Sequence, residues 1–150
     1  MRAQLLAALL SFAVAVAGVG CGDKSTPTTP APTQLDVSGR WAGDLTVQGV
    51  SGRMTWTLTQ TNTSVTGPVL VSLPSGTVLL NGFLTGTLTG TSLSYTIAVG
   101  PGGIPNQPTC GGQIGGTMAA AMSTMNGSIG VMSSSCTIQF SSNNLTLTKQ

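Results

Sequence analysis

From residue 37 to residue 150, apolar residues alternate with threonine or serine, and this alternation restricts the fold more than any other feature of the chain. In residues 54–59, Met54, Trp56 and Leu58 fall on one face of an extended strand and three threonines on the other. The same alternation returns at 93–99 and 145–148. Threonine suits the exposed face because its β-branched side chain favours extended backbone. The pattern predicts an all-β domain.

Glycine, asparagine, serine and proline interrupt the alternation at short intervals, which predicts tight turns between consecutive strands. Short connections favour antiparallel neighbours, since parallel strands need long crossovers. The segment from Met118 to Met125 is rich in the helix formers alanine and methionine, but glycines on both sides favour a hairpin there. We expect eight or nine strands, at 39–48, 53–61, 64–73, 77–88, 92–99, 113–121, 124–132, 136–141 and 143–148.

An up-and-down meander of this length removes its two exposed edges by closing into a barrel. The alternation alone allows an outer-membrane barrel with its apolar face outward, or a soluble barrel with that face inward. Membrane barrels carry aromatic girdles at both interfaces. The domain has only five aromatic residues: Trp41, Trp56, Phe83, Tyr95 and Phe140. Five are too few for two girdles. We therefore expect a small soluble barrel.

The amino-terminal segment has the order of an export signal: Arg2, an apolar stretch over residues 5–19, then small residues before Cys21. It is too short for an ordinary transmembrane helix. An ordinary secretory signal cut after Ala17 is one interpretation. The cysteine after small residues resembles the bacterial lipoprotein signal, in which that cysteine is lipidated and anchors the protein in the cell envelope. This second interpretation also leaves an even number of cysteines.

Three regions follow from these observations: a signal peptide over 1–20, a tether over 21–36 that begins at the lipidated Cys21, and a β-barrel domain over 37–150. The tether contains prolines at 27, 30 and 32 among small polar residues. Such a composition does not form a core and favours an extended, disordered spacer. A proline-rich docking motif for a partner is the alternative.

Gly39-Arg40-Trp41 at the start of the first expected strand resembles the lipocalin (calycin) and avidin-like barrels. The elements Trp56-x-Leu58-x-Gln60 and Val65-x-Gly67 are similar to those of small exported bacterial β-proteins. The resemblance implies that Trp41 packs across the closed end of the barrel, where lipocalins add an arginine from a late strand. This chain has only Lys149 as a late basic residue. Core packing and a ligand platform both remain open for the two tryptophans.

Cys110 and Cys136 are expected to form a disulfide, because exported proteins meet oxidising conditions. A loop of this size predicts about 3.5 kcal/mol of stabilisation. One expected strand separates the two cysteines, so the glycine- and proline-rich loop 100–109 would have to fold over that end of the barrel. A zinc site is the alternative, but two cysteines without histidine do not complete a tetrahedral shell.

Composition argues against catalysis, because the chain has no histidine and no glutamate, and Asp44 is the only acid well inside the domain. No basic stripe is present for nucleic acid, and no cofactor is expected.

Two functions remain. The first is a lipid-anchored protein that binds a small apolar or amphipathic ligand. The candidate ligand-binding residues lie on apolar strand faces: Trp56, Leu58, Tyr95, Ile97 and Met118. The second is a structural or protein-interaction module with a side-chain-filled barrel and an unidentified partner.

Overall fold

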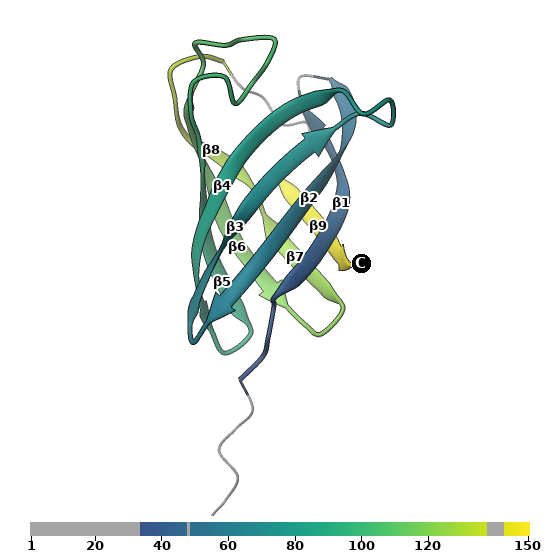
Figure 1. The fold of residues 1–150 in the computed structure, drawn as a ribbon. Coiled ribbons are helices and arrows are strands. Elements are labelled where there is room, and N and C mark those ends of the chain that lie inside the picture. Colours follow the sequence, from purple (N-terminus) through teal and green to yellow (C-terminus); the bar gives the residue numbers. More distant parts are fainter. Residues whose placement is uncertain (1–33, 48, 138–142) are drawn as a thin grey trace, which may run out of the picture. The chain divides into compact units, whose positions relative to one another are not determined.

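The described part of the chain forms nine β-strands and no helix. Figure 1 shows how the strands are arranged. The computed structural model describes residues 34–47, 49–137 and 143–150. The predicted signal peptide, Cys21 and most of the tether lie outside these residues. The strands are β1 (Gly39–Val47), β2 (Val50–Thr61), β3 (Ser64–Ser72), β4 (Val78–Thr89), β5 (Ser92–Val99), β6 (Gly112–Ala120), β7 (Thr124–Ser128), β8 (Gly130–Ser134) and β9 (Asn144–Lys149).

The strands close into an antiparallel barrel. Pairing runs from β5 through β4, β3, β2, β1, β9 and β7 to β6, and a β5–β6 ladder completes the ring. Strand β8 also pairs with β6, beyond the point where β7 ends, so β7 and β8 occupy one position in the wall. Closure leaves no free sheet edge among the ring strands, which confirms the predicted all-β meander.

Most of the expected strands agree with the observed ones to within three residues, and the hairpin at 118–125 is confirmed by the pairing of Ala120 with Met125. Two expectations were wrong. The strand expected at 124–132 is divided at Ile129 into β7 and β8, although the Ile129 N–H still donates to the Asn143 carbonyl in the register of the β7–β9 ladder. Cys136 and Thr137 do not begin a strand, and the rest of the expected strand at 136–141 lies outside the described residues.

Apolar side chains point into the barrel and hydroxyl side chains point out, as the alternation predicts. In β2, Met54 and Trp56 are fully buried while Thr57 and Thr59 are exposed. One core cluster spans the strands of the ring. On the outside, registered threonines and serines form rows across neighbouring strands, for example Thr61, Ser64, Thr87, Ser94 and Thr117. This is the arrangement expected of the soluble barrel.

The close approach of β2 to β3 explains the Val65-x-Gly67 element. Gly67 lies against the backbone of Thr57, and a Cβ at this position would overlap the Thr57 carbonyl oxygen. Any side chain at residue 67 would therefore push the two strands apart. The glycine is needed for space and not for an unusual backbone conformation.

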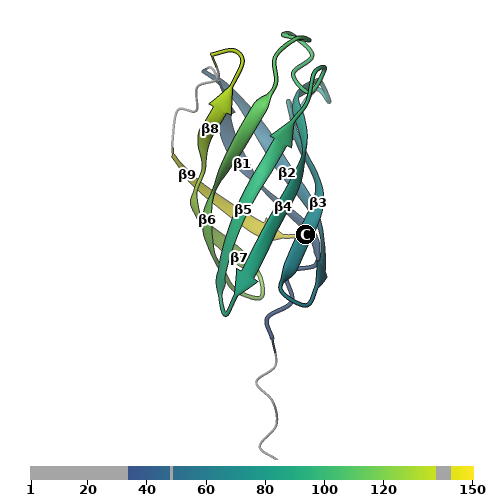
Figure 2. The same ribbon diagram turned by 90° about the vertical axis from the view of Figure 1, so that its left-hand side faces the viewer.

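The barrel has two different ends, which Figure 2 shows from the side. The short β2–β3, β4–β5 and β6–β7 hairpins lie at one end, where β1 begins. The long β5–β6 loop, residues 100–111, lies at the other end together with the β1–β2 and β3–β4 turns. We call these the closed end and the mouth.

Candidate functional site

The five residues proposed as ligand contacts all lie inside the barrel, on β2 (Trp56 and Leu58), β5 (Tyr95 and Ile97) and β6 (Met118). None is more than 4% exposed, and all belong to the core cluster. The structure therefore brings them together, but as side chains packed against one another. This packing is the arrangement of a filled barrel centre.

An aromatic pair occupies the middle of the barrel. The rings of Trp56 and Tyr95 meet edge to face with centroids 4.8 Å apart, and the Tyr95 hydroxyl donates to the Ser128 carbonyl oxygen at 2.9 Å. Burial raises the pKa of Tyr95. Both cross-strand neighbours of Tyr95 are glycines, Gly86 and Gly116, so no neighbouring side chain competes with its ring for space.

The two tryptophans differ in hydrogen bonding. The indole Nε1 of Trp41 donates to the Val37 carbonyl oxygen at 2.8 Å. The Nε1 of Trp56 is buried and has no acceptor within the described structure. A buried donor without a partner costs about 1 to 3 kcal/mol. Trp56 therefore carries an energetic penalty that Trp41 avoids.

Residues 34–38 cross the closed end and plug it, with Val37 fully buried in the core. Gln60, the last residue of the Trp56-x-Leu58-x-Gln60 element, holds this plug. Its Oε1 accepts from the Val37 N–H at 2.8 Å and its Nε2 donates to the Leu35 carbonyl at 2.9 Å. Beside it, hydrogen bonds from Ser38 hold the pKa of Asp36 below its ordinary value.

Lys149, on the last strand, places a cation at the closed end of the barrel. It pairs with Trp41 across the β1–β9 ladder, and its Nζ lies 5.4 Å from the centre of the Trp41 ring. A cation at this distance from an indole face is attracted by the ring. The resemblance to lipocalins implies an arginine at this place, and this chain has Lys149 instead.

The disulfide between Cys110 and Cys136 is present, with Cα atoms 5.5 Å apart. The expectation that one strand separates the two cysteines was wrong. Because β8 continues along β6, Gly112 pairs directly with Ser134, and the cysteines follow two residues farther along the same register. No loop movement is needed to bring them together.

The β5–β6 loop nevertheless folds over the mouth. The Asn81 N–H of β4 donates to the Gly103 carbonyl at 2.7 Å, and the side chain of Ile104, a residue of this loop, is largely buried. Between this loop and the barrel wall lies a hollow of about 100 Å³. Its walls are aliphatic and its remaining lining residues carry side-chain amides: Val47, Val50, Leu79, Leu80, Ile104, Asn106 and Gln107. Sequence reasoning missed this hollow, because loop 100–111 has no periodic pattern.

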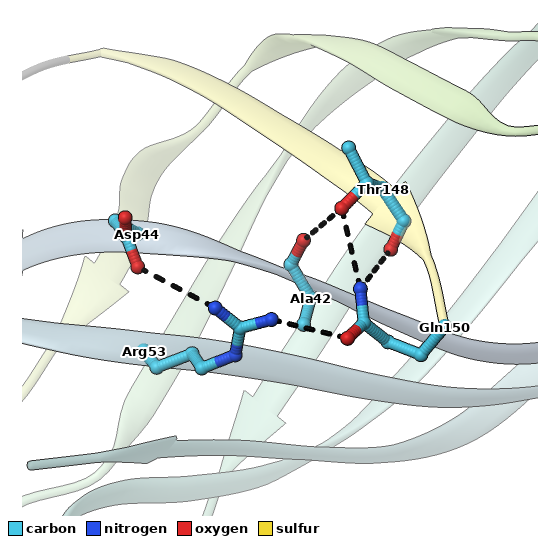
Figure 3. Close-up of polar contacts among 5 residues, drawn as sticks. All are labelled: Ala42, Asp44, Arg53, Thr148 and Gln150. Carbon is cyan, nitrogen blue, oxygen red and sulfur yellow. Dashed lines mark hydrogen bonds and ion pairs between the residues drawn. The ribbon is translucent and has the colours of Figure 1, made fainter. Parts of the chain in front are cut away.

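A polar cluster lies on the outer face of β1, β2 and β9, as Figure 3 shows. Arg53 reaches Asp44 at 4.0 Å and donates to the Gln150 side-chain oxygen at 3.1 Å. Gln150 is oriented in turn by its bond to the Thr148 carbonyl. Both charged side chains are more than half exposed, so this pair contributes little to stability. Shallow surface hollows flank the pair on both sides.

Within the described ranges, no three His, Cys, Asp or Glu side chains gather in a way that suits a metal ion. The same part of the chain contains no helical segment suited to crossing a bilayer. No protein-family model, curated protein or solved structure gives a significant match to this chain. The likeness to lipocalin-like barrels therefore rests on the closed antiparallel barrel and on the short motifs described above.

Proposed function

We propose that this chain is an exported, non-enzymatic β-barrel protein, anchored through lipid at Cys21 in a bacterial cell envelope, that binds a small apolar or amphipathic molecule at the mouth of its barrel. The hollow beneath loop 100–111 is the observation that carries this proposal. Aliphatic walls with a few polar groups are the usual composition of small-molecule sites. Its volume of about 100 Å³ suits a short aliphatic group.

Two observations support export and anchoring. The disulfide between Cys110 and Cys136 is typical of an oxidising compartment. Gln34, the first described residue, lies at the closed end, where its side chain donates to the Asn62 carbonyl. Cys21→Ser should abolish labelling by a fatty-acid analogue in the native host and release the protein from the membrane fraction.

Ligand binding is tested on the mature protein by nuclear magnetic resonance of its methyl groups. Titration with 1-butanol should give saturable shifts at Leu79, Leu80 and Ile104. Val50→Asp, which places a carboxylate in the hollow, should weaken this binding at least tenfold. Leu70→Asp is the matched control, because Leu70 lies on the outer face of β3 and is 39% exposed, against 43% for Val50. Trp56→Phe should leave binding unchanged.

A structural or interaction module is the second candidate, and the packed interior favours it. The five side chains expected to contact a ligand fill the barrel centre instead of lining a space. This candidate predicts no saturable shift with any aliphatic probe, together with a specific partner crosslinked in intact cells. Absence of binding to the mature, folded protein would therefore decide in its favour.

A further inference from the structure

We propose that the mouth hollow selects uncharged molecules with a hydrogen-bonding head and an aliphatic tail of about four carbon atoms. This inference rests on the ligand binding proposed above and adds the chemical class of the ligand. It follows from three properties of the hollow: the charge of the segments around it, the groups that line it, and its size.

The described segments at the mouth contain no acidic or basic side chain. Residues 45–47, 49–52, 72–82, 99–113 and 130–137 include no Asp, Glu, Lys, Arg or His. The nearest charged residues along the chain, Asp44 and Arg53, face outward and pair with each other. Arg40 and Lys149 lie toward the closed end, on β1 and β9. A charged ligand head would therefore find no counter-ion among the residues that line the mouth hollow.

The lining groups match a neutral head. Leu80 and Ile104 are buried, so an ionised group placed against them would lose its hydration without an opposite charge in return. Asn106 and Gln107 lie at the border of the hollow and carry side-chain amides, which both donate and accept hydrogen bonds. An alcohol or a primary amide satisfies such groups in both directions. A carboxylate accepts only and an ammonium donates only.

The volume sets the length of the tail. An apolar cavity of about 150 Å³ accepts benzene, which has six carbon atoms. In proportion, the hollow of about 100 Å³ accepts about four carbons. Each added methylene should strengthen binding about fourfold until the space is filled, and no further after that.

Charge selection is tested with four probes that share a butyl chain: pentanamide, 1-butanol, pentanoate and butylammonium. Binding to the mature protein at pH 7 is measured from the methyl shifts of Ile104 and Leu80. We expect the two neutral probes to bind at least tenfold more tightly than both ions. Equal or tighter binding of pentanoate or butylammonium would overturn the selection while leaving ligand binding intact. If no probe binds, the proposed function itself fails.

Two further measurements test the mechanism. In the series from acetamide to heptanamide, affinity should rise about fourfold per methylene and level off near pentanamide. A continued rise through heptanamide would refute the size limit.

Val50→Lys places a cation in the lining and should shift the preference from pentanamide to pentanoate. Leu70→Lys, on the outer face, should leave the preference unchanged, and a shift in this control would refute the local origin of the selection.

Discussion

Replacing each buried tryptophan by phenylalanine separates packing from hydrogen bonding in the barrel core. Trp41→Phe and Trp56→Phe delete the same atoms from two side chains that are both fully buried. The lost apolar contacts and the residual cavities are therefore comparable. The ring contacts differ, with Lys149 near Trp41 and Tyr95 against Trp56, but phenylalanine keeps an aromatic ring at both positions. The main difference is in the hydrogen bonds, since Trp41 donates to the Val37 carbonyl and Trp56 donates to no described acceptor.

The magnitude follows from that difference. Trp41→Phe takes the indole donor away from a buried carbonyl, which costs about 1 to 3 kcal/mol. Trp56→Phe removes a donor that is already unpaired, so it relieves a penalty of similar size. The two effects add, so we expect the free energy of unfolding of Trp56→Phe to exceed that of Trp41→Phe by about 2 to 6 kcal/mol. For a barrel of this size, the lower end of this range corresponds to a difference of about 8 °C in melting temperature.

Equilibrium unfolding in guanidinium, with the disulfide intact, measures both variants through the fluorescence of the remaining tryptophan and through far-ultraviolet circular dichroism. Phe83→Leu serves as a control on the outer face, where a change within about 0.5 kcal/mol is expected. Equal destabilisation by the two substitutions, or a lower stability of Trp56→Phe, would show that the Trp56 indole has an acceptor. The reasoning from its unpaired donor would then be wrong.

Three other changes test the fold. Cys110→Ser together with Cys136→Ser should lower the free energy of unfolding by about 3.5 kcal/mol in chemical denaturation; an effect below 1 kcal/mol would argue against loop constraint. Tyr95 is the only tyrosine. Because burial raises its pKa, stability should be unaffected below pH 10.0 and fall above it, and absorbance at 295 nm should rise only as the barrel unfolds. A rise at pH 10.0 in the folded state would contradict this. Gly67→Ala should destabilise by about 2 kcal/mol or more through its clash with Thr57, whereas Gly49→Ala, in an open turn, should cost less in thermal melts.

The alternation of apolar and hydroxyl residues was enough to predict the strands and their inward faces. This worked because side chains alternate strictly along an extended chain, so Met54 and Trp56 must share a face once β2 forms. The same pattern does not distinguish a filled interior from a hollow one. Trp56, Leu58 and Met118 were therefore chosen correctly as inward residues, but the pattern could not show that they pack against one another.

Contacts between distant segments account for what the sequence did not reveal. The positions of β8 and Cys136 depend on the register with β6, which no local pattern encodes. The role of Gln60 depends on the path of residues 34–38 across the closed end. The mouth hollow depends on the bond between Asn81 and Gly103, in which a long loop meets β4.

The plug at the closed end also determines how this domain is best attached to a solid support. Gln34 contacts the β2–β3 turn, and the Gln150 backbone N–H donates to the Arg40 carbonyl near the start of β1. The last described residue is thus held beside the start of β1 and away from loop 100–111. Immobilisation through a tag at the carboxyl terminus should therefore leave the mouth open to the surrounding solution, and the binding curve on a biosensor should match the curve measured free in solution.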